Sequence, residues 1–276
     1  MEQVLKTMLE NVRAKSPLVH NITNYVTVND VANVLLAAGG SPIMSDDADD
    51  VEDITSICGG LNINIGTLNK NTIPSMFLAG KKANALGHIV LLDPVGAGAS
   101  RLRTDTANRL MQEVRFDAVR GNISEIKTLC TGSGSTKGVD ADAVDAVTEA
   151  NLDNGVQLVK TFAAQTGCII AVTGAIDLVG DGERCWCIRN GRAEMSRITG
   201  TGCQLSALMT AFLVANPDRK LDAAAAAVCM MGLAGEIGWA NMQPGDGNST
   251  YRNRIIDAIF NMTGDALEEG AKYELR

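Results

Sequence analysis

The sequence predicts a single α/β domain with a mostly parallel central sheet, flanked by helices and ending in a small antiparallel edge. Short runs of strand character alternate with longer stretches of helical period along most of the chain. The run Ile89–Leu92 is apolar at every position, which is typical of a parallel strand buried on both faces. The chain has 276 residues, 46% of them hydrophobic, and no linker divides it, so we expect one domain over residues 1–276.

The first part of the chain carries the strand candidates of the parallel sheet. These strands are expected at Ser41–Met44, Leu61–Ile65, His88–Asp93, Phe116–Arg120 and Cys168–Thr173. The helices between them are expected near Thr27–Ala38, Val51–Cys58, Ile73–Leu86, Asp105–Val114 and Leu152–Gln165. This alternation predicts βαβ units joined by right-handed crossovers.

The pattern changes after Thr173, where strands become short and turn sequences frequent. An antiparallel meander is expected from Ile176–Val179, Arg184–Arg189 and Ala193–Met195. Three helices should follow, near Cys203–Val214, Leu221–Met242 and Asn248–Thr263. A surface loop is expected at Thr131–Ala141; its stretch Gly132–Lys137 lacks the residue order of a P-loop.

Charge and cysteine content narrow the classes of partner and compartment. Lys and Arg number 24 against 32 Asp and Glu, a net charge of −8 without basic clusters, so we expect neither nucleic acid nor anionic membrane as a partner. The longest apolar run, Ala223–Gly235, is shorter than the roughly 18 residues of a membrane span. Met1–Lys6 shows no secretion signal. Seven cysteines without a C-x-x-C pair favour a reducing, cytoplasmic location.

A glycine-rich turn, Asp93-Pro94-Val95-Gly96-Ala97-Gly98, directly follows the apolar strand Ile89–Leu92. Ligands of open parallel sheets bind beyond the carboxyl ends of the strands, so Asp93 is well placed for chemistry. The same residues fit a tight βα turn with a local hydrogen bond from Asp93. Both interpretations stay open at this point.

A second glycine cluster, Thr199–Ala207, precedes an apolar helix. The backbone N–H groups of Gly200, Thr201 and Gly202, together with the helix N-terminus, predict an anion hole. Cys203 would lie in the first turn, where a thiol pKa tends to be lowered. The alternative is an ordinary glycine turn before a buried helix, with Cys203 as a small core residue.

Other polar residues stand where a core or turn is expected. Glu125 follows the strand that ends at Arg120, and its carboxylate suits Mg²⁺ directly or through water. With Asn122 it also fits a capping box. Arg120 fits a phosphate contact or a solvated strand end. Asn24 fits a contact to a small polar ligand or a turn.

Taken together, these stretches resemble the hydroxyethylthiazole kinase family within the ribokinase-like fold. The segments that carry the resemblance are Val19–Asn24, Gly40–Met44, Asn64–Leu68, Leu92–Gly98, Arg120–Glu125, Val172–Gly174 and Gly200–Cys203. The resemblance implies transfer of the γ-phosphate of ATP to the alcohol of 4-methyl-5-(2-hydroxyethyl)thiazole, a thiamine precursor. It also implies Mg²⁺ and a homotrimer whose thiazole sites lie at subunit boundaries.

The resemblance assigns roles to the residues that match the family's motifs. In the thiazole pocket it places four residues: Asn24, Met44, Gly66 and Gly200. Two residues, Arg120 and Thr173, would contact the nucleotide. Three residues, Asp93, Asn122 and Glu125, would lie in the metal and phosphate region. Cys203 occupies the position of the catalytic aspartate of most ribokinase-like enzymes and is the candidate acceptor of the alcohol proton.

Three other functions remain open from the sequence. The nearest is a kinase for the hydroxymethylpyrimidine half of thiamine, and the next is a nucleotide-dependent hydratase repair enzyme. Both would be expected to carry aspartate in place of Cys203. The third is a non-catalytic metabolite-binding protein, which would bind its ligands without turnover.

Overall fold

One sheet runs through the whole of the computed structural model, which describes residues 3–131 and 146–276. Its strand order is β2-β1-β3-β4-β5-β6-β7-β8-β9. The strands are β1 (Leu18–Ile22), β2 (Ser41–Met44), β3 (Gly60–Asn64), β4 (Ile89–Asp93), β5 (Ala118–Asn122), β6 (Ile169–Thr173), β7 (Asp177–Gly180), β8 (Cys185–Ile188) and β9 (Tyr273–Leu275). Strands β1 to β6 are parallel and β6 to β9 antiparallel, so the predicted fold class is confirmed.

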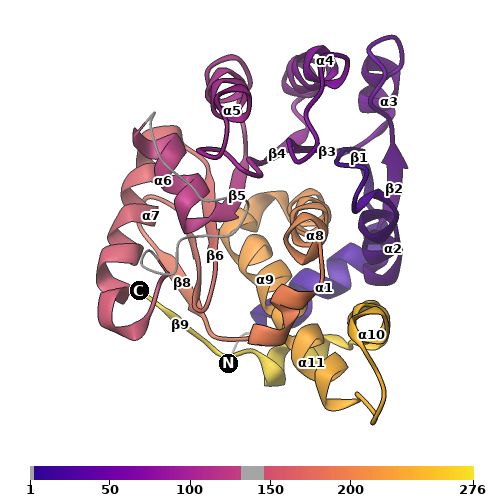
Figure 1. Ribbon diagram of the computed structural model, residues 1–276, viewed down its shortest axis with the longest axis vertical. Coiled ribbons are helices and arrows are strands. Elements are labelled where there is room, and N and C mark those ends of the chain that lie inside the picture. Colours follow the sequence, from indigo (N-terminus) through magenta and orange to yellow (C-terminus); the bar gives the residue numbers. More distant parts are fainter. Residues whose placement is uncertain (1–2, 132–145) are drawn as a thin grey trace.

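Helices cover both faces of the sheet (Figure 1). One face carries α3 (Val51–Ile57), α4 (Thr72–Leu86), α5 (Arg101–Glu113), α6 (Ile123–Thr131) and α7 (Leu152–Thr166). The other carries α1 (Val4–Lys15), α2 (Val28–Ala38), α8 (Thr201–Ala215), α9 (Lys220–Ala240), α10 (Asn248–Asn261) and α11 (Gly264–Gly270). Short 3-10 turns are η1 (Glu149–Asn151), η2 (Ala193–Arg197) and η3 (Pro217–Arg219). Apart from Thr131, the last residue of α6, the loop predicted at Thr131–Ala141 lies outside the described residues.

Strand β1 was not predicted, although it lies inside the sheet between β2 and β3. Its sequence includes His20 and Asn21, which are polar yet buried. The His20 ring forms two hydrogen bonds, from Nδ1 to the Thr55 hydroxyl and from Nε2 to the Ser45 carbonyl, both at 2.9 Å. Because these contacts satisfy the ring, the strand can be buried without an apolar run.

The predicted strand Ala193–Met195 is wrong, since these residues belong to the 3-10 turn η2. The edge of β8 that such a strand would need is taken by β9 from the C-terminus. The Arg276 N–H donates to the Cys185 carbonyl at 2.8 Å, and the Cys185 N–H donates back at 2.7 Å. The ring of Tyr273 also packs on Trp186, with centroids 4.4 Å apart.

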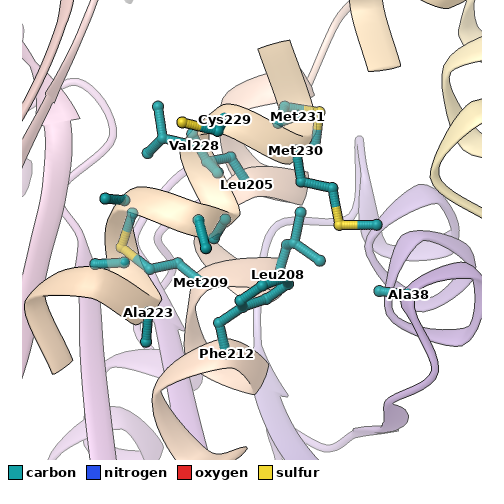
Figure 2. Close-up of a cluster of buried hydrophobic side chains, with 14 of the residues drawn as sticks. Ala38, Leu205, Leu208, Met209, Phe212, Ala223, Val228, Cys229, Met230 and Met231 are labelled. Carbon is teal, nitrogen blue, oxygen red and sulfur yellow. The ribbon is translucent and has the colours of Figure 1, made fainter. Parts of the chain in front are cut away.

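The core is thickest where α8 and α9 pack together against the sheet. Leu208 and Phe212 of α8 lie beside Met230 of α9 and Ala38 of α2 (Figure 2). The stretch Pro217–Ala240 is long and apolar enough to cross a membrane by length and composition, but 78% of its most apolar window is buried inside the molecule. Its apolar character is therefore explained by its place in the core.

The parallel strands share a direction, so their carboxyl ends meet at one edge of the sheet. Helix α8 begins at this edge, because Ser206 in its second turn bonds Asp93 at the end of β4. The residues predicted from seven separate segments lie along this edge of the sheet.

Candidate active site

The N-terminus of α8 forms one side of the site. Gly200 precedes the helix with a φ of +85°, and a Cβ on it would lie 2.1 Å from the Thr27 side chain. Glycine is therefore required there on both conformational and steric grounds. The first N–H groups of the helix have no partner within it, so they point their positive ends toward the edge of the sheet. Gly200, Thr201 and Gly202 lie at this helix start, and the anion hole assigned to them stays a prediction.

The predicted thiazole residues lie around the Cys203 sulfur. Asn24 Nδ2 donates to Cys203 Sγ at 3.2 Å. A Cβ on Gly66 would lie 2.9 Å from Asn24, so the loop after β3 passes directly over this amide. Met44 at the end of β2 packs, partly exposed, against the apolar cluster that contains Cys203. The structure thus brings these residues together.

The electrostatics of Cys203 differ from the prediction. Burial raises the pKa of its thiol, and the nearby charge of Asp93 raises that pKa further. Arg120 and the Asn24 amide oppose these effects without overcoming them. The expected lowering of the thiol pKa at a helix N-terminus is therefore wrong, because loss of water around the buried sulfur, followed by the charge of Asp93, has the larger effect.

Asp93 lies at the centre of the site, with none of its surface exposed. Its Oδ2 accepts from Asn64 Nδ2 and from the Ser206 hydroxyl, both at 2.8 Å, and lies 3.5 Å from Arg120 Nη1. Its Oδ1 is buried and has no hydrogen-bond partner among the described residues. Burial raises the pKa of this carboxyl despite these contacts.

Glu125 forms the capping box with Asn122 that the sequence allowed. The Asn122 N–H donates to Glu125 Oε2 at 2.8 Å, and the Glu125 N–H donates to Asn122 Oδ1 at 2.9 Å. Glu125 Oε1 also accepts from the Gly96 N–H at 2.7 Å. Burial, followed by the charge of Asp93, raises the pKa of Glu125 to about 7. The capping box is therefore confirmed and holds the buried carboxylate of Glu125 near Asp93, whereas its role toward Mg²⁺ stays a prediction.

The predicted nucleotide residues are bonded to each other. Arg120 Nη2 donates to Thr173 Oγ1 at 2.5 Å across the ends of β5 and β6. A Cβ on Gly202 would lie 2.5 Å from Arg120 Nη1, so the guanidinium lies against the start of α8. A fixed cation and a helix N-terminus thus face the same space, which is the environment of an anion such as a phosphate.

Several residues of the site were not predicted. Asn64 and Ser206 bond Asp93, and Asp177 accepts from the Gly174 N–H at 2.8 Å, with burial raising its pKa to about 7. Arg103 donates to the carbonyls of Gly66 at 2.6 Å and Val95 at 3.0 Å. One of these residues could have been found from sequence: Ser206 follows Cys203 by three residues, which places both side chains on the same surface of the predicted helix.

Comparisons with known proteins agree with this geometry. A sequence profile of the hydroxyethylthiazole kinase family matches residues 9–265. The chain is 58% identical to the hydroxyethylthiazole kinase of Clostridium acetobutylicum, covering 98% of this chain and 99% of that one. It is 47% identical to the one from Ruminiclostridium cellulolyticum, covering 96% and 95%.

Solved structures give the same result. A hydroxyethylthiazole kinase protein from Pyrococcus horikoshii superposes with a TM-score of 0.87 at 32% identity, covering 99% of this chain and 98% of that one. A pyridoxal kinase from Staphylococcus aureus superposes with a TM-score of 0.58 at 14% identity over 94% and 98% of the two chains, which shows the ribokinase-like fold alone. By sequence and by structure, the chain belongs to the hydroxyethylthiazole kinase family.

Proposed function

We propose that this chain transfers the γ-phosphate of ATP to the hydroxyl of 4-methyl-5-(2-hydroxyethyl)thiazole at the carboxyl edge of its sheet, in thiamine biosynthesis or salvage. The observation that carries the proposal is the contact between two groups of residues. Asn24, Gly66 and Cys203 form a small buried cluster, and Arg120 with Asp93 lies beside it at the start of α8. An alcohol and a phosphate chain therefore meet at the helix N-terminus.

Each residue has a part in an in-line transfer. The alcohol oxygen forms a bond to the γ-phosphorus, the bond to the ADP oxygen breaks, and the alcohol proton passes to Cys203 Sγ in its thiolate form, which becomes a neutral thiol. The N–H groups of Gly200, Thr201 and Gly202 stabilise charge on the transferring group. Arg120 and Thr173 hold the nucleotide. Because burial raises the pKa of Cys203, only the fraction of the protein that carries this sulfur as a thiolate can accept the proton.

A magnesium ion fits the chemistry of this site. Mg²⁺ in kinases is held by one or two carboxylates, by water and by phosphates, and it neutralises their charge. Asp93 Oδ1 is a buried oxygen without a partner among the described residues. Glu125 lies close enough for the charge of Asp93 to raise its pKa. No group of three or more His, Cys, Asp or Glu side chains occurs in the part of the chain described, which agrees with an ion held largely by ATP. Asn122 orients Glu125.

We also propose that the protein is a cytoplasmic homotrimer with its thiazole sites at subunit boundaries. Every residue of the edge strand β2 is partly exposed, and Tyr25 and Val26, next to Asn24, are each 63% exposed. A neighbouring subunit over these apolar side chains would close the pocket beside Met44. All seven cysteines are free, which suits a reducing compartment.

The test is a coupled assay of ADP release with Mg²⁺ and a panel of alcohols. We expect turnover with hydroxyethylthiazole and little with hydroxymethylpyrimidine or pyridoxal. Preference for the pyrimidine would favour the alternative kinase. Binding of ATP and thiazole without ADP release would indicate a binding protein instead.

A further inference from the structure

A chain of buried polar groups leads from Asp93 to the Cys203 sulfur, and Asn64 lies in its middle. Asn64 Nδ2 donates to Asp93 Oδ2 at 2.8 Å, and Asn64 Oδ1 accepts from Asn24 Nδ2 at 3.1 Å. Asn24 Nδ2 donates in turn to Cys203 Sγ at 3.2 Å. Asn24 is 5% exposed and Asn64 is 1% exposed, so bulk water has little access to these bonds.

Both ends of this chain fix the direction of its hydrogen bonds. At one end, Asp93 Oδ2 accepts from the Ser206 hydroxyl and, as a carboxylate oxygen, from Asn64. At the other end, the Thr27 backbone N–H, which can only donate, bonds Asn24 Oδ1 at 3.1 Å. Turning over the Asn64 amide would place its oxygen against a carboxylate and its NH₂ against the NH₂ of Asn24. The network therefore has one orientation.

This orientation has two consequences for the substrate side of the site. Both N–H bonds of Asn24 Nδ2 are used, so the sulfur of Cys203 is an acceptor there and its own hydrogen points elsewhere. The same Asn64 oxygen also accepts from the Gly66 N–H at 2.9 Å. One carboxamide thus holds the side chain of Asn24 and the backbone of Gly66.

We propose that Asn64 is a positioning residue of the phosphoryl-transfer site, which transmits the hydrogen-bond direction set by Asp93 to Asn24 and so keeps an N–H donor on the Cys203 sulfur. The inference deepens the proposed function and rests on it. Protein groups engage the Asn64 carboxamide on both sides, and its own hydrogen bonding near the sulfur also lowers the pKa of Cys203, so Asn64 acts on the thiol and not on the substrate.

The test compares Asn64→Ser with Asn62→Ser. Asn62 lies two residues earlier on the same face of β3, is fully buried, and donates to Asn21 Oδ1 at 3.0 Å rather than to this network. Serine is too short to reach Asp93 and Asn24 together. We would follow alkylation of Cys203 by iodoacetamide against pH, using mass spectrometry to distinguish it from the other cysteines. The charged groups that face the sulfur, Asp93 and Arg120, are unchanged in both variants.

In Asn64→Ser we expect the midpoint of alkylation to rise by about one pH unit, because the thiolate loses a fixed donor. We expect kcat to fall by about 10-fold with the KM for ATP unchanged. Asn62→Ser should change neither, although both variants should lose similar thermal stability. In a Cys203→Ala background the effect of Asn64→Ser on kcat should shrink, because the two residues act together.

An unchanged midpoint in Asn64→Ser, or an equal rise in Asn62→Ser, would overturn the proposal. If Asn64→Ser does not unfold cooperatively, the pair Asn64→Leu and Asn62→Leu replaces it, because leucine preserves the volume. Alkylation needs no turnover, so a wild-type protein that phosphorylates no thiazole alcohol would refute the proposed function while still testing Asn64.

Discussion

At the scale of single residues, Glu125 shows that a folding role and a chemical role can belong to one side chain. Its carboxylate accepts from the N–H groups of Asn122 and Gly96, which starts α6 and fixes the turn after β4. Those bonds lower the pKa of the carboxyl, but burial and then the charge of Asp93 outweigh them and raise the pKa to about 7. The residue is thus aimed at the site by the bonds that form the helix.

Glu125→Gln should lower kcat by about 10²-fold or more at limiting Mg²⁺ and leave the fold intact. The stability of the wild type should also depend on pH in a defined direction. A folded-state pKa above the unfolded value contributes stability that is complete below about pH 4.5 and is lost as pH rises through about 7. The variant should flatten this slope in the free energy of unfolding, measured by urea denaturation between these values. Turnover close to wild type would refute the assignment of Glu125.

Cys203→Ala should slow kcat and leave measurable activity, because positioning and electrostatics supply most of the acceleration of phosphoryl transfer. A general base is worth roughly 10²–10⁴-fold. Cys203→Asp should be at least as active as wild type, since an aspartate is ionised more readily than a thiol whose pKa burial has raised. Steady-state kinetics of the three proteins decide the matter. Equal rates for alanine and wild type would make Cys203 a small residue at a helix start.

Met44→Ala should raise the KM for the thiazole alcohol and leave the KM for ATP nearly unchanged. Met44 packs against the apolar cluster that contains Cys203, and a polarizable thioether suits a flat sulfur heterocycle. Initial rates with each substrate varied in turn provide the measurement. A parallel rise in both constants would indicate a general packing role.

At the scale of elements, the start of α8 combines a helix N-terminus with the guanidinium of Arg120. Gly202 permits this, because any side chain there would meet the Arg120 nitrogens. Gly202→Ala should therefore displace the guanidinium, raise the KM for ATP and lower kcat/KM by about 10-fold, measured by initial rates.

Gly155→Ala in α7 is the matched control for Gly202→Ala. The nearest atoms to a Cβ there belong to Leu178, at 2.9 Å, and Val147, neither of which the site uses, so only thermal stability should fall. A similar loss of activity in both variants would refute the role given to Gly202.

The elements predicted from sequence are those whose pattern is strong and local. Strands β4 and β6 were predicted from their continuous apolar runs, and β2, β3 and β5 from their alternation with stretches of helical period. Strand β1 was missed because hydrogen bonds of His20, invisible in sequence, satisfy its polar residues. The segment Ala193–Met195 was assigned to a strand because sequence cannot tell which segment will reach the edge of β8; β9 does so from the C-terminus. The hydrogen-bond network of Asn64 was not predicted for a similar reason, since it joins residues from four separate segments of the chain.

At the scale of the whole molecule, the site combines the ends of β1 to β6 with the start of α8 (Figure 1). Short sequence motifs predicted most residues of the site, but the contacts and burial of these residues depend on how the sheet and helices pack. The raised pKa of Cys203 is an example, because no local signal reports how much water a fold removes from a sulfur. The apolar surface beside Asn24 is likewise a property of the assembled chain.

Val26→Asp should convert the proposed trimer into smaller species and lower activity in parallel, because it places a charge in an apolar contact. Sedimentation velocity and specific activity over a range of protein concentrations would measure both effects. Leu102→Asp is the matched control, as Leu102 is 53% exposed on α5, which α4 and α3 separate from β2 (Figure 1). A wild-type protein that sediments as a monomer would refute the assembly.

The bridge made by Arg103 has a consequence for the kinetics of substrate binding. It ties the loop after β3 to the loop after β4 through two carbonyls. Ordering a backbone residue costs about 1–2 kcal/mol, and here the loss of entropy occurs when the chain folds. The free enzyme therefore already has the shape that receives its substrates. Association of each substrate should be a single step, with a rate that rises linearly with concentration and shows no plateau from a slow isomerisation.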